Sequence, residues 1–578
     1  MNLKQGRALM EEIYSRMDFG RYDEADVKAR KLIREAEKRG WQQLLNNALE
    51  MRLVIAIESN NLEGAEKLAI KLAKQPPTAY GIFLQARLLM EQEHKKKALE
   101  KGYEALSFAE SHETTTPKIM FEKICNLLGK ILSDYGEHQA ALKYYWQSLK
   151  AADTLQLKAL EYSNYLFNLH YVYNDPVEYF NAHIGYNELF KGISHYDHRG
   201  KNTIKEMDEA ARQKIRIGYI SPDFRYHVVL RFSWAMLANY DKEQFEVYCY
   251  HNNPHEDNYS EEIKNMTDSW RNISGMSAQD AAEAIYKDKI DILVDLAGHT
   301  KGNGLPVMAY KPAPVQVSGI GYFATTGLKT VDYFLSDMAL ESEQDYFVED
   351  IICLEHSHFC YTPIYVAPIP REAPCMKNGY ITYGSFNHIR KVTDEVLELW
   401  ANILKSVPQS HLILKGSVFD DEYGYELFVD RLAKNGIDMT SEDWKERIEL
   451  RGFSKDYLQE YFDVDIALDT FPYPGGGTTC DALYMGVPVI TLSGNSHGER
   501  FGKSLLENIG LSEFVVYNKQ NYYDLAVALA GEKEIINNFH LGLRHMMEQS
   551  PLMDRKLYMS ELELTYKKIW YEYCKNNS

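Results

Sequence analysis

A glycine and threonine loop in the last quarter of the chain has the residue types that hold a phosphate. The pattern is an apolar strand over 464–468, a short helix and a second strand over 487–492, and the loop between strand and helix contains Gly475, Gly476, Gly477, Thr478 and Thr479. Glycines leave room for an anion, threonines can cap the helix, and a helix N-terminus carries partial positive charge. The loop therefore indicates a nucleotide-handling enzyme, with a tight turn that binds nothing as the alternative.

Alternating strands and helices position this loop. A first series of strands is expected at 215–220, 244–250, 290–296, 315–321 and 331–336, and a second at 380–386, 411–415, 447–451, 464–468 and 487–492. Helices are expected between the strands, for example over 277–287. Strands that alternate with helices predict parallel sheets covered by helices on both faces. Two doubly wound domains in tandem bind ligands in the cleft at the carboxyl ends of their strands.

The first 190 residues read as helix almost throughout and contain a fragmentary repeat. Short similar motifs end at Ala25, Ala65, Ala98 and Ala141. This resembles the tetratricopeptide repeat, in which small residues let antiparallel helices pack closely, with about 34 residues per unit. The alternative is a plain helical bundle. We therefore expect a helical domain over 1–195, a linker over 196–214, and α/β lobes over 215–375 and 376–578.

Composition excludes several classes of protein. The chain has 578 residues, 45% of them hydrophobic, and a net charge of −19, which disfavours binding to nucleic acid or anionic membranes. Seven cysteines without a CxxC pair favour reduced thiols over disulfides or a zinc site. No apolar run reaches about 18 residues, and the N-terminus lacks an apolar signal core. We expect a cytoplasmic protein with no membrane span and no nucleic-acid partner.

Five ordered segments within 215–530 carry a family resemblance. They are 216–227 (RIGYISPDFRYH), 295–300 (DLAGHT), 311–327, 384–391 (GSFNHIRK) and the glycine loop. Together they resemble the O-linked N-acetylglucosamine transferase family, which includes the SPINDLY-like proteins. The resemblance implies an α/β GT-B fold of two Rossmann-like lobes behind a tetratricopeptide-like superhelix. It also implies an inverting enzyme, without metal or cofactor, that moves a sugar, most simply GlcNAc, from a UDP-sugar to Ser or Thr hydroxyls of a protein, which the helical repeats could recruit.

The resemblance assigns nucleotide-binding roles to residues of the second lobe. Lys391 matches the family lysine that contacts the diphosphate, and Asp481 matches a carboxylate that accepts hydrogen bonds from the ribose hydroxyls. Asn387 and His388 precede Lys391 in the same loop and are further candidates for the nucleotide or sugar. Tyr457 stands where the family commonly has a histidine that stacks on uracil, which leaves the identity of the base open.

Two histidines join Lys391 as catalytic candidates. His227 matches the family histidine placed at the sugar and the acceptor, and a near-neutral pKa would let it take the acceptor proton. His299, in Gly-His-Thr at another strand end, is the second candidate; a buried loop histidine is its alternative. The Asp463-Val-Asp465 pair looks like a metal-binding DxD, but its place in an apolar strand favours capping, so no metal is predicted.

Departures from the family pattern keep alternatives open. The glycine loop reads Pro-Gly-Gly-Gly-Thr-Thr over 474–479 where related loops tend to read Asn-Gly-Gly-Thr-Thr-Thr, so one loop hydroxyl is lost, and Gly304 replaces a common arginine. The alternatives are a transferase of the same fold with another donor, UDP-glucose or a GDP-sugar, or with an Asn acceptor, and a non-catalytic helical-repeat scaffold.

Overall fold

The computed structural model describes the chain except for residues 19–20, 115, 174, 199–213, 343–345 and 578. The chain divides into two compact units: residues 1–161 with 421–424, and residues 162–420 with 425–578. Most of the predicted linker over 196–214 lies outside the described residues. Among the described helices, none is both long and apolar enough to cross a membrane.

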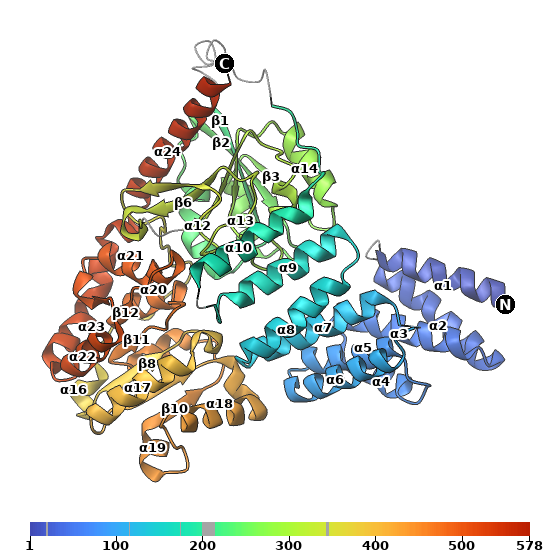
Figure 1. Cartoon of the computed structure of the whole chain (residues 1–578), viewed down its shortest axis with the longest axis horizontal. Helices are drawn as coiled ribbons and strands as arrows, with labels where there is room; N and C mark the ends of the chain where they lie inside the picture. The colour runs from blue at the N-terminus through green and yellow to red at the C-terminus, as the bar shows by residue number, and fades with distance from the viewer. Residues whose placement is uncertain (19–20, 115, 174, 199–213, 343–345, 578) are drawn as a thin grey trace. The chain divides into compact units, whose positions relative to one another are not determined.

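The first unit is built from antiparallel helix pairs (Figure 1). Its helices are α1 (Leu3–Asp18), α2 (Tyr22–Arg39), α3 (Gln42–Glu58), α4 (Leu62–Leu72), α5 (Ala79–Glu91), α6 (Lys95–Ser111), α7 (Lys118–Asp134) and α8 (His138–Ala151). Successive helices pack on each other, and α1, α3 and α5 also pack on the next odd-numbered helix. This is the stacking expected of a helical-repeat array.

The recurring alanines explain this packing. Each lies in the first turn of the second helix of a pair, and all four have no exposed surface: Ala25 in α2, Ala65 in α4, Ala98 in α6 and Ala141 in α8. A methyl group at these positions lets the paired helices approach closely. The prediction of tetratricopeptide-like helix pairs is confirmed.

The second unit contains two parallel sheets. The first lobe has strands in the order β3-β2-β1-β4-β5-β6-β7. These are β1 (Ile215–Ser221), β2 (Phe245–His251), β3 (Ser269–Asn272), β4 (Ile292–Asp295), β5 (Val315–Ser318), β6 (Tyr333–Asp337) and β7 (Asp350–Leu354). The register pairs Ile217 with Val247 on one side of β1 and with Ile292 on the other, so buried aliphatic residues fill the centre of the sheet.

The second lobe repeats the plan with the strand order β10-β9-β8-β11-β12-β13. Its strands are β8 (Thr382–Ser385), β9 (His411–Lys415), β10 (Ile448–Arg451), β11 (Ile466–Leu468), β12 (Val489–Leu492) and β13 (Val515–Val516). All pair in parallel. Both orders reverse direction next to the first strand of the lobe, which places ligand crevices at the carboxyl ends of the central strands.

Helices surround both sheets. They are α10 (Pro176–Asn187), α12 (Val228–Ala238), α13 (Asn258–Met266), α14 (Ala278–Lys287), α15 (Leu305–Met308), α16 (Pro374–Asn378), α17 (Asp394–Ser406), α18 (Glu422–Lys434), α19 (Glu442–Arg447), α20 (Gly477–Tyr484), α21 (Phe501–Glu507), α22 (Lys519–Leu529), α23 (Lys533–Glu548) and α24 (Arg555–Asn576). Most cover the sheet of their own lobe. The predicted helix over 277–287 corresponds to α14.

Each predicted strand overlaps an observed one, so the doubly wound fold is confirmed. The strands that were not predicted are β3, β7 and β13. They are short or lie at sheet edges, and β3 has no fully buried residue, so it lacks the apolar run that marks a central strand.

Two boundaries differ from the predicted domains. The compact units divide after Glu161, within α9 (Leu155–Leu169), so the end of α9 and all of α10 belong with the α/β lobes and not with the preceding helices. Helix α24, predicted as part of the second lobe, packs on β5, β7 and α12 of the first (Figure 1). Figure 1 shows it in red alongside that lobe.

We predict that Ala141→Leu destabilises the helical unit, whereas Ala140→Leu on the same turn of α8 does not. Ala141 is fully buried and Ala140 is partly exposed, so only the first change overpacks a helix contact, at a typical cost of about 1–3 kcal/mol. Urea unfolding of the whole chain, followed by helical circular dichroism, measures the difference. Equal midpoints for the two variants would contradict close packing at the repeat alanine.

Candidate active site

A buried carboxylate fixes the glycine loop. Asp469 directly follows β11, and one of its oxygens accepts hydrogen bonds from the Gly475 amide at 2.7 Å and from Asn387 Nδ2 at 2.9 Å. The other oxygen accepts from Thr491 Oγ1 at 2.8 Å, and burial raises the pKa of the acid. The loop therefore has a defined shape before any ligand arrives. Sequence reasoning missed this role, although the position of Asp469 at a strand end was a usable signal.

The three glycines of the loop have different surroundings. A Cβ on Gly475 would lie 2.5 Å from Thr479 Oγ1, and a Cβ on Gly477 would lie 2.4 Å from Val228 Cγ2, but a Cβ on Gly476 would meet nothing within 4 Å. Packing thus requires glycine at the first and third positions. Gly476 alone faces open space, so it marks the point where a phosphate can approach the backbone.

Gly476 is also the N-cap residue of α20, and no side chain caps that helix. The expectation that Thr478 and Thr479 cap it is wrong, because the Thr478 hydroxyl instead donates to Asn387 Oδ1 at 2.6 Å. Asn387 is buried between this hydroxyl and Asp469, and it supports the loop from beneath. An uncapped helix N-terminus leaves its first amides to bind an anion.

Lys391 lies directly beside the loop. It ends a short 3-10 helix, Ile389–Lys391, after β8, its Nζ donates to the Pro474 carbonyl at 2.8 Å, and it lies 3.8 Å from the centre of the Tyr473 ring. Burial lowers the pKa of Lys391 to about 8, and Asp469 opposes the shift. With this pKa, Lys391 is mostly charged at pH 7, and its ammonium lies beside the uncapped start of α20, where an anionic ligand would stabilise it. His388, by contrast, is exposed and caps the 3-10 helix through its Nδ1 atom.

The first lobe reaches the same loop through α12. His227 is the N-cap residue of α12, and its neighbour Val228 is the residue that packs on Gly477. The N-termini of α12 and α20 therefore meet at the glycine loop. His227 Nδ1 accepts a hydrogen bond from the Val229 amide at 3.3 Å, and burial, with help from Arg225 and Arg231, lowers the pKa of the ring to about 4. The ring is therefore neutral at pH 7. Asp223 Oδ1 also lies 3.4 Å from Nδ1, and we assign the proton to Nε2 because Nδ1 accepts from the Val229 amide.

Asp481 is placed one turn into α20, but its carboxylate is fully occupied. Arg231 Nη1, from α12, donates to both oxygens at 2.7 and 2.8 Å. Tyrosine hydroxyls donate as well: Tyr361 at 2.8 Å, Tyr365 at 2.6 Å and Tyr457 at 2.7 Å. This buried group joins the two lobes next to the predicted nucleoside position. The sequence reasoning did not select Arg231.

His299 lies in the interior of the first lobe. Its Nε2 donates to the Thr326 carbonyl at 2.9 Å, so Nδ1 accepts from the Ser163 hydroxyl, also at 2.9 Å. Burial holds the pKa of the ring well below its usual range. Nδ1 thus joins α9 to the first lobe and Nε2 holds the loop that follows β5, so His299 is the buried, hydrogen-bonded loop histidine that the sequence had left open as the alternative.

An aromatic cluster next to Lys391 was not predicted as part of the site. The ring of His170, at the end of α9, lies 3.8 Å from that of Phe323 and 4.7 Å from that of Tyr473. The sequence analysis had no signal that separates these rings from an ordinary core, since tyrosines and histidine at helical spacing are typical of both.

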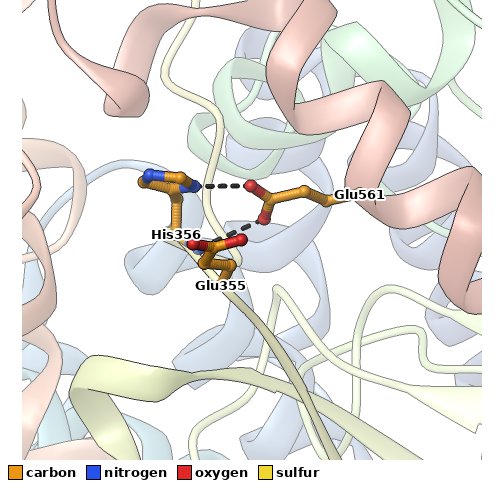
Figure 2. Close-up of side chains that lie close together, drawn as sticks. All are labelled: Glu355, His356 and Glu561. Carbon is orange, nitrogen blue, oxygen red and sulfur yellow. Dashed lines mark hydrogen bonds and ion pairs between the residues drawn. The ribbon is translucent and has the colours of Figure 1, made fainter.

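The acidic groups considered as metal ligands have other partners. Asp465 accepts from the backbone amides of Thr382 and Cys375, and Asp463 pairs with Arg451. Within the described ranges, one cluster has three potential ligands, Glu355, His356 and Glu561. Figure 2 shows the His356 ring facing Glu561, which comes from α24; that carboxylate also accepts from the His356 amide. This contact fastens α24 to the end of β7.

Curated relatives and a solved structure show what the chain is similar to. It is 38% identical over 379 residues to a probable UDP-N-acetylglucosamine--peptide N-acetylglucosaminyltransferase SPINDLY of Petunia hybrida, which covers 64% of this chain and 40% of the relative. The protein of the same name from Arabidopsis thaliana is 38% identical over 367 residues, with 62% and 40% covered. The chain thus spans about two fifths of the length of these relatives.

The structure of a mutant O-GlcNAc transferase from Thermobaculum terrenum superposes with a TM-score of 0.80 at 26% identity, covering 92% of this chain and 98% of the other. The shared region includes the helical part and both lobes. Residues 192–366 and 361–562 match glycosyl transferase family 41, and the chain therefore belongs to that family.

Proposed function

We propose that this chain is an inverting, metal-independent glycosyltransferase that moves GlcNAc from UDP-GlcNAc to Ser or Thr hydroxyls of a protein. The observation that carries the proposal is the uncapped N-terminus of α20, which opens at Gly476 beside Lys391. The names of the curated relatives supply the donor and the peptide acceptor. Their greater length leaves the activity of this chain as a proposal.

The chemistry needs stabilisation of a departing diphosphate. Negative charge grows on the leaving group during glycosyl transfer, so fixed positive groups around it lower the barrier most. Here the ammonium of Lys391 and the N-termini of α12 and α20 converge on the loop, and together they could replace a metal ion in this role. Metal independence itself stays a prediction.

The histidines act as positioning residues in this proposal. With a proton on Nε2 and a pKa near 4, His227 is a hydrogen-bond donor toward the sugar or acceptor and a poor general base at pH 7. His299 holds α9 against the first lobe. For Asp481 to bind ribose, the ribose hydroxyls must take the places of tyrosine hydroxyls such as those of Tyr365 and Tyr457.

Two further expectations stand as part of the proposal. The stacked helices of the first unit offer a surface that recruits the acceptor protein. A cytoplasmic location, without a nucleic-acid partner, follows from the composition of the chain alone.

The decisive test is transfer by the purified protein in the presence of EDTA. We expect UDP to raise the thermal midpoint and UDP-GlcNAc to label lysate proteins on Ser or Thr, because protein groups alone neutralise the diphosphate. A panel with UDP-glucose and GDP-sugars decides the donor, and mass spectrometry separates Ser and Thr from Asn acceptors. No change in melting with either UDP or GDP would reject the nucleotide site and favour a scaffold.

The two loop glycines give a matched pair of substitutions. Gly476→Ala should leave stability unchanged and weaken UDP binding by about tenfold or more, because its methyl group occupies the space where a phosphate approaches. Gly477→Ala should lower the thermal midpoint, because its methyl group meets Val228. Calorimetry and thermal melting measure both effects. The assignment fails if Gly476→Ala binds UDP as tightly as the unmodified chain.

UDP affinity should depend on the proton of Lys391. The free lysine has a pKa lowered to about 8, and a bound diphosphate favours the charged form, so binding takes up a proton above that pH. Affinity should therefore be constant below pH 8 and fall by up to about tenfold per pH unit above it. Calorimetry in buffers of different ionisation enthalpy measures the uptake. Lys391→Met should abolish both the fall in UDP affinity above pH 8 and the proton uptake. Proton uptake that persists in this variant would point to another titrating group.

A further inference from the structure

The Asp481 carboxylate has no free position for another hydrogen-bond donor. Its Oδ1 atom accepts from Arg231 Nη1, Tyr361 and Tyr365 at 2.7, 2.8 and 2.6 Å, and its Oδ2 atom accepts from Arg231 Nη1 and Tyr457 at 2.8 and 2.7 Å. A carboxylate offers about four lone-pair sites, and these contacts fill them. A ligand hydroxyl that binds Asp481 must therefore displace one of these donors.

Three of the donors have further ties to the lobes. Tyr361 has no exposed surface, and its backbone amide donates to the Leu552 carbonyl at 2.8 Å. Arg231 is buried on α12 and balances the charge of Asp481, so its departure would leave a buried charge unpaired. Tyr457 begins a 3-10 helix, and its hydroxyl also accepts from Arg231 Nη2 at 3.1 Å.

Tyr365 lies in a segment with much weaker support. Residues 363–372, here called the crossover segment, run without helix or strand from β7 of the first lobe to α16 of the second. Among the described residues, no backbone amide of the crossover segment donates to a backbone carbonyl. Val366 and Ile369 within it are 98% and 81% exposed. The backbone around Tyr365 can therefore move at little cost in hydrogen bonds or buried surface.

The position of the Tyr365 side chain depends on the Asp481 cluster. Its hydroxyl contacts Asp481 and the Tyr361 hydroxyl, and its ring lies 4.8 Å from the Arg231 guanidinium. The side chain is partly exposed, so a displaced hydroxyl can bind water. Of the four donors, Tyr365 is thus the one that a ligand can replace most easily.

The distance to the glycine loop suits a nucleoside. Asp481 lies five residues beyond Gly476 along α20, which is about 7.5 Å at the rise of an α-helix. A ribose joined to a diphosphate at Gly476 can reach a carboxylate at this distance.

We propose that the Tyr365 hydroxyl occupies the ribose position and that the donor nucleotide displaces it; this rests on the proposed function. One hydroxyl then replaces another on the same carboxylate oxygen, so Asp481 keeps its hydrogen bonds in both states. A ligand with ribose hydroxyls can make this exchange, whereas an inorganic diphosphate cannot. The crossover segment thus closes the nucleoside site, and the displacement lowers the apparent affinity for the donor.

The test compares Tyr365→Phe with Tyr361→Phe in the full chain, with UDP, or GDP if the chain prefers it, as the probe in calorimetry. Tyr365→Phe keeps the ring and removes the competing hydroxyl, so the nucleotide should bind about three- to tenfold more tightly. Tyr361→Phe removes a hydroxyl from the same oxygen, but this hydroxyl is buried and stays in place when the nucleotide binds. The control should therefore lower the thermal midpoint without tightening nucleotide binding.

Inorganic pyrophosphate serves as the internal reference, because it has no ribose and should bind Tyr365→Phe and the unmodified chain equally. The inference is overturned if Tyr365→Phe binds the nucleotide no more tightly than the unmodified chain, or if its affinity for pyrophosphate rises as much. Weaker nucleotide binding by Tyr365→Phe would show that the hydroxyl is a ligand of the nucleotide, which also overturns the inference. Failure of the unmodified chain to bind either UDP or GDP would instead reject the proposed function.

Discussion

The active site depends on the interaction of one buried carboxylate with the backbone of the glycine loop. Asp469 binds the Gly475 amide and, through Asn387, the hydroxyl of Thr478, so the loop and the start of α20 are held by the end of β11. A carboxylate with several donors is stable when buried, whereas a helix N-terminus without a cap has unsatisfied amides. The structure therefore concentrates the unsatisfied donors at Gly476, where a diphosphate can bind.

The join between the two lobes follows from the same arrangement. Val228 packs on Gly477, and Arg231, one turn further along α12, pairs with Asp481 one turn along α20. Two helices that meet by their N-termini repel each other electrostatically, since both ends carry partial positive charge. The buried Arg231–Asp481 pair and its tyrosine hydroxyls offset this repulsion in the free protein, and a bound diphosphate would offset it more directly.

Much of this arrangement could be predicted from the sequence, and the limits have physical causes. The glycine loop was recognised because its residue types and its place at a strand end indicate a phosphate site, and Lys391 was recognised through the family resemblance. Arg231 and His170 were not, because each reaches the site only through tertiary packing: Arg231 from the third residue after a helix start, and His170 from a helix that looks like part of the repeat array. The capping role expected for Thr478 was wrong since Asn387, distant in sequence, competes for its hydroxyl.

Helix α10 and the end of α9 belong with the α/β lobes because a glycine of the first lobe lets the α10 backbone approach closely. Gly327 has a φ of +73°, and a Cβ at this position would lie 2.0 Å from the backbone oxygen of His183 on α10. Only glycine admits that approach without strain. The close contact, together with the Ser163–His299 hydrogen bond, fixes α9 and α10 to the first lobe and holds His170 against Tyr473. The last helices thus help to build the aromatic wall beside Lys391, whereas the loop, Lys391 and the two helix N-termini form the proposed diphosphate site.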